Sequence, residues 1–282
     1  MKKEKRIHTS KCVAPYAEHI ICPEGCSNRL NWIQYRFRTY CYDWVTYIRH
    51  PIRMAGIALA LLYMTVMGFD AITTAYGNTQ VTSSIIGGAQ GLAAAFGLFG
   101  SLSFPLLRRR IGLNNVGVLG LGLEVAALIP CIVSIWLPGS SFDPSALHTF
   151  WHPAPVNNSH IKSPNEKNMN TKDMFSIATF FSGIIVSRYG LWLSDITITQ
   201  IMQEQIIEHK RGVINGVQDS LNMGMDMVKS VLVIMFPYPQ QFGLLIILSF
   251  ISIFLGFLSY MIYFFTNGNS EMQSDKDSTE DE

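Results

Sequence analysis

The sequence from 241 to 265, QFGLLIILSFISIFLGFLSYMIYFF, contains no charged residue and is long enough to cross a bilayer as one α-helix. The segment 82–107 is also free of charge. A helix on the surface of a soluble protein would show polar residues on every turn, and neither segment does. The chain of 282 residues is 49% hydrophobic and 15% charged, whereas soluble domains contain about 25% charged residues. These features predict a membrane protein.

Four further segments share this apolar character and carry only a few charged residues. Together the segments predict an all-α, polytopic membrane protein with six transmembrane helices at about 54–76, 82–107, 112–137, 174–207, 213–236 and 241–265. The transmembrane domain, 54–265, would follow a basic N-terminal segment, 1–53, and precede an acidic tail, 266–282. A net charge of +1 argues against nucleic-acid binding. No P-loop or G-x-S-x-G motif is present, so we expect no enzyme activity.

Lysine and arginine residues gather on one side of the predicted bilayer. The segment 1–53 holds ten of them, 108–110 and 210–211 hold five more, and the loop 138–173 holds three. Because short loops rich in Lys and Arg stay in the cytoplasm, we expect both termini to be cytoplasmic and 138–173 to face outside. Asn157 begins an Asn-Asn-Ser sequon in that outer loop and is a candidate glycosylation site.

Two predicted helices carry a polar face within the bilayer. The face on 213–236 has spacings of 4, 3, 4 and 3 and consists of Asn215, Asp219, Asn222, Asp226 and Lys229. The face on 174–207 consists of Arg188, Trp192, Asp195 and Thr199. Such faces turn towards each other or towards water, which indicates that they line a cavity on a solute pathway. A set of structural ion pairs is the alternative interpretation.

The first predicted helix changes character at Gly68-Phe69-Asp70, where a Thr-rich stretch begins. A helix broken there would expose carbonyl groups and helix ends that bind ions. Alternatively, the helix ends and the Thr-rich stretch is an outer loop. The Gly-x-x-x-Gly motifs at 87–91 and 212–216 predict close helix contacts.

Two clusters of metal-ligating residue types are interpreted as ordinary side chains. His148 and His152 are four residues apart, but the intervening Trp and following Pro argue against a helix. Cys22 and Cys26 lie near other possible ligands, yet no second pair completes a four-ligand zinc site. We therefore expect no resident metal or cofactor.

Several strings occur in a recognisable order. They are FRT at 37–39, LYMTVMGFD at 62–70, GLW at 190–192, RGVINGVQ at 211–218 and FGLL at 242–245. Over roughly 35–265 the sequence resembles the ferroportin family of cellular iron exporters. The resemblance implies the C-terminal half of a major facilitator fold, iron ion export for iron homeostasis, the plasma membrane, and Fe²⁺ as cargo. Besides the lipid bilayer, it implies a second copy or an N-terminal half as partner. A non-transporting membrane protein that regulates or binds a relative is the alternative.

The sequence departs from the family at the positions that the resemblance implies for metal and hormone binding. Asp70 is retained, but the next position, a metal-binding Cys in the family, is Ala71. Asp226 is retained as the best remaining metal ligand, while the family's partner His is Lys229 and a Tyr of the hepcidin site is Met223. We therefore expect no control by hepcidin. An ammonium group in a low-dielectric cavity needs a partner, so Lys229 is predicted to pair with Asp226 or Asp219, unless it extends to the interface.

Overall fold

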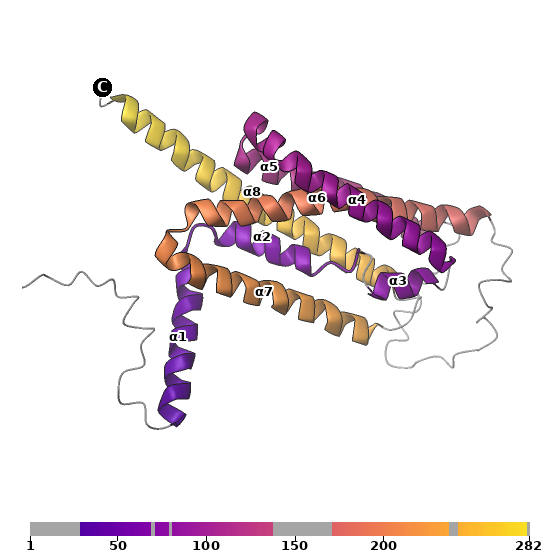
Figure 1. The fold of residues 1–282 in the computed structure, drawn as a ribbon, viewed down its shortest axis with the longest axis horizontal. Helices are drawn as coiled ribbons and strands as arrows, with labels where there is room; N and C mark the ends of the chain where they lie inside the picture. Colours follow the sequence, from indigo (N-terminus) through magenta and orange to yellow (C-terminus); the bar gives the residue numbers. More distant parts are fainter. Residues whose placement is uncertain (1–28, 69–70, 79–80, 138–170, 237–241, 281–282) are drawn as a thin grey trace, which may run out of the picture. The chain divides into compact units, whose positions relative to one another are not determined.

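A computed structural model describes residues 29–68, 71–78, 81–137, 171–236 and 242–280, and all of their regular secondary structure is helical. The predicted all-α class is thereby confirmed. The chain divides into two compact units, 1–49 and 50–282. The first unit contains α1 (Arg29–Arg49). The second contains the other helices in Figure 1, namely α2 (Arg53–Tyr63), α3 (Ala71–Asn78), α4 (Ser83–Ile111), α5 (Leu113–Trp136), α6 (Thr171–Gln205), α7 (Glu208–Met235) and α8 (Phe242–Glu280).

Four of these helices are long and apolar enough to cross a membrane, within the described ranges: α4, α5, α6 and α8. The other two predicted spans have a different character. The helix α2 has 11 residues and rises only about 16 Å, which is short of a hydrocarbon core about 30 Å thick. The helix α7 has 28 residues, but Asp219, Asp226 and Lys229 interrupt its apolar sequence.

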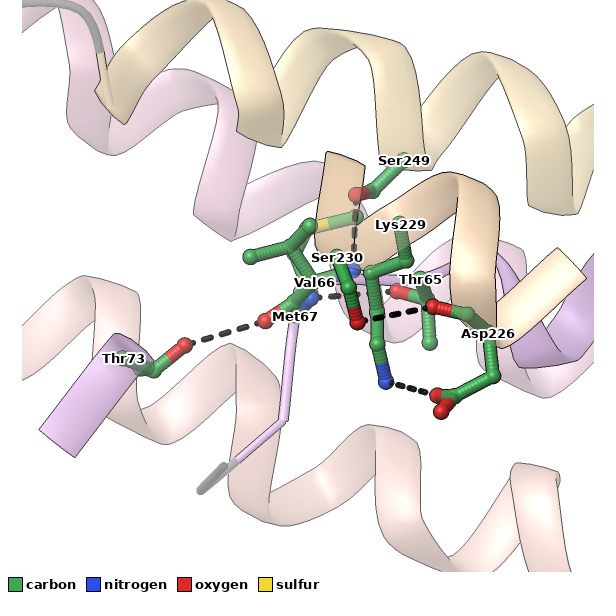
Figure 2. A network of polar contacts seen from close by, with 8 residues as sticks. All are labelled: Thr65, Val66, Met67, Thr73, Asp226, Lys229, Ser230 and Ser249. Carbon is green, nitrogen blue, oxygen red and sulfur yellow. Dashed lines mark hydrogen bonds and ion pairs between the residues drawn. The ribbon is translucent and has the colours of Figure 1, made fainter. Parts of the chain in front are cut away.

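The first predicted span is not one continuous helix. The helix α2 ends at Tyr63, a few residues before the predicted break at Asp70, and the Thr-rich stretch begins a second helix, α3. Side chains replace the lost helical hydrogen bonds in the gap. The amide of Val66 donates to Ser249 Oγ of α8 (2.8 Å), and Thr73 Oγ1 of α3 donates to the Val66 carbonyl (2.9 Å; Figure 2).

Both terminal segments contain helix that the sequence did not predict. The basic segment 1–53 contains the helix α1, and the acidic tail predicted at 266–282 is the continuation of α8 as far as Glu280. No proline occurs between 242 and 280, so nothing in the backbone chemistry forces the helix to stop at the end of its apolar part.

Glycines bring α4, α5 and α6 into close contact. A Cβ atom on Gly190 of α6 would lie 2.7 Å from both the Glu124 nitrogen and the Gly120 carbonyl oxygen of α5. A Cβ atom on Gly100 of α4 would lie 2.7 Å from the carbonyl oxygen of Tyr189 in α6. These contacts with backbone atoms leave no room for a side chain, and they allow the three helices to pack at short range.

The Gly-x-x-x-Gly motifs singled out in the sequence do not make such contacts. Among the described residues, a Cβ atom on Gly87, Gly91, Gly212 or Gly216 would meet no atom within 4 Å outside its own helical turn. The prediction of close helix contacts at these motifs was therefore wrong for this chain. Spacing alone does not indicate which face of a helix meets a neighbour, because small residues occur on every face of a membrane helix.

Candidate functional site

A cavity of about 300 Å³ opens where the end of α2, the helix break, α6 and α7 meet. Two acidic side chains, two basic side chains and two aromatic rings contribute to its wall. The full lining is Leu62, Tyr63, Thr65, Gly68, Arg188, Leu191, Trp192, Asp195, Asp226 and Lys229. The polar faces predicted for the two charged helices thus share one cavity through Arg188, Trp192 and Asp195 on α6 and Asp226 and Lys229 on α7.

The most direct interaction in this cavity is an ion pair within α7. Lys229 Nζ lies 2.6 Å from Asp226 Oδ1, one turn away on the same face (Figure 2). The Lys229 side chain is 14% exposed and that of Asp226 49% exposed, so the ammonium is largely withdrawn while the carboxylate reaches the open side of the cavity. The predicted pairing of Lys229 is thereby confirmed, with Asp226 as the partner.

The ion pair lies beside the broken helix. Figure 2 shows Asp226 and Lys229 next to the non-helical backbone that runs from Thr65 to Met67. The Met67 amide donates to Thr65 Oγ1 (3.1 Å), which fixes this backbone locally. Ser230 Oγ donates to the backbone carbonyl oxygen of Asp226 (3.0 Å), one turn earlier in the same helix, and not to the Asp226 carboxylate.

Part of the polar face of α7 is structural. Gln218 Nε2 donates to Asn222 Oδ1 (2.8 Å) and to the Gly56 carbonyl oxygen of α2 (2.9 Å). Both amide side chains are buried, with Asn222 only 6% exposed. Asn222 therefore supports the α2–α7 contact and lies outside the cavity. Gln218 was not among the predicted site residues, although its position four residues before Asn222 puts it on the same face.

The remaining predicted residues lie apart from the cavity or beyond the described ranges. Asn215 does not line the cavity, and Asp219 and Met223 are exposed on α7, with Met223 71% exposed. Ala71 begins α3. Asp70, the sequon at Asn157, the histidines at 148 and 152 and the cysteines at 22 and 26 all fall outside the described residues.

A buried carboxyl group on α5 was overlooked as a site residue. Glu124 is 1% exposed, and its Oε2 atom has no hydrogen-bond partner within the described structure. Its electrostatic neighbours are Arg188 and Asp195 of α6, which connects it to the wall of the cavity. The signal was present in the sequence, because Glu124 is the single charge in an otherwise apolar segment, and such residues are usually functional.

The described residues contain no group of three or more His, Cys, Asp or Glu side chains that could hold a metal ion. The cavity instead offers two carboxylates, Asp195 and Asp226, together with two cationic groups, Arg188 and Lys229. Carboxylate oxygens bind hard divalent cations, but an adjacent ammonium competes for the same charge. The arrangement resembles a cation site in which the protein supplies its own cation.

Comparison with known families gives a match to the model described as Ferroportin1 (FPN1) over residues 16–253. Mouse ferroportin is 38% identical over 246 residues, covering 79% of this chain and 43% of the relative. Rat ferroportin is 36% identical with the same coverage, and solute carrier family 40 member 1 of zebrafish (Danio rerio) is 34% identical, covering 83% and 45%. The chain therefore spans less than half the length of the curated relatives it matches.

Solved structures show the same fold. A bacterial homologue of the iron transporter ferroportin, crystallised in an outward-facing state with soaked iron, superposes with a TM-score of 0.63 at 20% identity, covering 77% of this chain and 47% of that chain. A bacterial homologue of the iron transporter ferroportin in an inward-facing state gives a TM-score of 0.60 at 21% identity, covering 76% of this chain and 45% of that chain. The family match over most of the sequence and the relatives above 30% identity lead to one conclusion: the chain belongs to the ferroportin family.

Proposed function

We propose that this chain is a half-transporter of the iron-export type that carries its own cation, Lys229, in the cation site and does not move Fe²⁺ without a second half. The single observation that carries the proposal is the Lys229–Asp226 ion pair inside the cavity. Iron as the cargo class is supported by the relatives, whose names and titles describe ferroportins and iron transporters. The chain would take part in membrane transport and would not be an enzyme.

The chemistry of the cavity explains why cation binding would be weak. A divalent cation at the Asp226 carboxylate would lie close to the Lys229 ammonium, which is 2.6 Å from that carboxylate. Two unit charges 4 Å apart repel by about 4 kcal/mol at an effective dielectric constant of about 20. Because Asp226 is half-exposed, water would screen part of this repulsion. Neutral imidazole or thiolate, which soft and borderline metals favour, is replaced at 229 and 71 by Lys and Ala.

A second half is needed to cover the exposed side of α7. Asp219 is exposed there, Asp226 is half-exposed, and Met223 and Met227 are 71% and 65% exposed. Carboxylates do not face lipid in a stable membrane protein, so this side meets water or another protein. The bacterial homologue that shares the fold is about twice as long as the matched region. The second half would be an N-terminal half or another copy of this chain.

The membrane arrangement completes the proposal. The broken helix α2–α3 and the charged helix α7 would join the four apolar helices to give six spans, half of a major facilitator fold. Lysine and arginine counts support cytoplasmic termini and an outer loop at 138–173, with Asn157 as its glycosylation site. The plasma membrane would be the location, as the family suggests. Hepcidin would not act on this chain, since Ala71 lacks the thiol and Met223 lacks the phenol that the resemblance assigns to hormone binding.

A non-transporting role is the second candidate function, and the same ion pair favours it. A half in which Lys229 neutralises the cation site could bind a full-length relative and change the metal efflux of that relative without moving metal itself. Co-expression with a relative separates the two candidates. A half-transporter would gain iron efflux with an N-terminal half, whereas a regulator would change the efflux of an intact relative and show none with the half.

Calorimetric titration of the purified full-length chain with Co²⁺ tests the site. The unmodified protein should show no binding at Asp226, and Lys229→Ala should raise the affinity by on the order of 100-fold through loss of the repulsion. Lys229→Arg is the matched control, because it keeps the charge and should leave binding weak. Tight Co²⁺ binding to the unmodified protein that is lost in Asp226→Ala would show that the carboxylate is free, and the proposal would be wrong.

A further inference from the structure

The helix α1 has one apolar face that is open to its surroundings. Phe37, Tyr40, Cys41, Trp44 and Val45 follow at spacings of three, one, three and one, which gathers them within one side of an α-helix. Phe37 is 69% exposed, Tyr40 51% and Val45 44%, and Cys41 is also exposed. The rings of Tyr40 and Trp44 pack edge to face, with centroids 5.9 Å apart, so the aromatic part of this face is preformed.

The other side of α1 carries polar residues and the exposed Tyr42. Thr39, Asp43 and Thr46 lie opposite the apolar face, and the exposed side chains of Arg38 and Arg49 lie at its border. Arginine at the border of an apolar stripe can lay its methylene groups along the stripe while its guanidinium reaches outwards. Over the whole helix, four arginines outnumber one aspartate, so α1 is a cationic amphipathic helix.

The aromatic residues indicate what kind of surface this face meets. Three aromatic residues of α1, namely Phe37, Tyr40 and Trp44, lie on this face, and two of them are Trp or Tyr. Trp and Tyr are enriched where a membrane meets water, because their rings are apolar and carry one polar group. A cationic amphipathic helix with such an apolar face lies in the plane of the membrane interface.

The position of α1 in the chain supports the same partner. Only three residues, 50–52, separate its last residue from the first residue of α2, so the two lie at most about 14 Å apart even when the connection is extended. The segment 1–53 holds ten Lys and Arg against four Asp and Glu. A basic segment next to a membrane helix is attracted to anionic phospholipids. Each Lys or Arg near the surface raises the binding constant for the membrane about fivefold.

We propose that α1 is an in-plane membrane-surface helix that binds anionic phospholipid, with Phe37, Tyr40, Cys41 and Val45 in the headgroup and upper acyl region. Arg38 and Arg49 contact the lipid phosphates from its border. The helix anchors the N-terminal segment to the leaflet on its own side of the membrane. This role is independent of whether the chain transports iron.

Spin-label accessibility of the full-length chain in nanodiscs tests the orientation of α1. In a background without other cysteines, a nitroxide is attached at Phe37→Cys on the apolar face or at Thr39→Cys on the polar face. With phosphatidylserine present, the label at 37 should be accessible to oxygen and shielded from a water-soluble nickel chelate, and the label at 39 should show the reverse. Equal access of the chelate to both positions would overturn the proposal.

Charge variants test whether lipid, and not protein, covers the apolar face. Arg38→Gln with Arg49→Gln should lower the ratio of docked to undocked helix at the label on 37 about 25-fold, whereas the matched Arg38→Lys with Arg49→Lys variant should retain docking. Docking should also weaken in nanodiscs of phosphatidylcholine alone. Protection of position 37 that persists in the glutamine variant, in neutral lipid and in detergent would mean that α1 packs on protein, and the proposal would be wrong.

Discussion

At the scale of single residues, the proposed function depends on one lysine. Lys229 is withdrawn from solvent, and the ion pair with Asp226 lets the chain keep an ammonium group there. In low dielectric an unpaired charge costs several kcal/mol, so the sequence predicted a partner for Lys229, although the spacing left both Asp226 and Asp219 as candidates. The contact that Gln218 and Asn222 make with α2 could not be predicted. A polar face on a helix has the same sequence pattern whether it lines a cavity or packs on another helix.

Restoring metal-ligating chemistry at two positions should create a cation site. Lys229→His with Ala71→Cys would supply imidazole and thiolate near Asp226, and both suit divalent transition metals. We expect Co²⁺ affinity in calorimetry to rise on the order of 100-fold over the unmodified chain, as the ammonium is removed. Adding Asp226→Ala to the double variant should abolish the gain. An unchanged affinity in the double variant would show that Ala71 and Lys229 do not face a common site.

His50, in the short connection before α2, should make stability depend on pH. Burial, and then the nearby charge of Lys210, lower the pKa of His50 below its usual value. Its Nδ1 atom accepts a hydrogen bond from the Ile52 amide (3.3 Å), which requires that this nitrogen is unprotonated. The unfolded chain, with a pKa near 6.5, therefore binds more protons than the folded chain below that pH, so stability is lost as pH falls through about 6.5.

Thermal unfolding in detergent would measure this effect. The unfolding midpoint of the unmodified chain should rise between about pH 5 and pH 7 and level off above, and His50→Gln should reduce that rise. All other ionisable groups are the same in both proteins, so the difference between them reports on His50. The same pH dependence in both proteins would contradict the assignment.

At the scale of elements, the helices without charge were predictable and the interrupted ones were not. The segments that became α4 and α8 have apolar sequences that only a helix can satisfy in lipid. The break after α2 depends on Ser249 of α8, which lies 183 residues away from its partner Val66, and no local pattern contains that information. The spacing of the apolar residues in α1 contains its amphipathic face, but the sequence prediction described this segment only by its basic charge.

Adding one methyl group at a glycine should change the free energy of unfolding by different amounts on different helices. Gly190→Ala puts a Cβ against the backbone of α5 at 2.7 Å and should destabilise the chain by about 1–3 kcal/mol through overpacking. Gly216→Ala, where nothing lies within 4 Å, is the matched control and should be neutral or stabilise by up to about 1 kcal/mol through helix propensity. Denaturant unfolding monitored by circular dichroism would compare them. Equal effects would contradict the close packing of α5 and α6.

At the scale of the whole molecule, orientation follows from charge counts and can be tested by labelling. An impermeant maleimide added outside intact cells should react with a single cysteine introduced at position 160 and not with one at position 20. The expectation rests on fifteen Lys and Arg on the inner segments against three in the loop 138–173. Labelling at 20 but not at 160 would reverse the topology.

Iron efflux from loaded vesicles tests most directly whether this chain transports metal alone. Vesicles that contain the purified chain and are filled with Fe²⁺ should lose iron no faster than protein-free vesicles, since the Lys229 ammonium neutralises the Asp226 carboxylate in every copy of the chain. Vesicles with a full-length ferroportin are the positive control. Efflux by the unmodified chain above the protein-free rate, abolished by Asp226→Ala, would show that the internal ion pair does not close the site and that this chain transports metal without a separate N-terminal half.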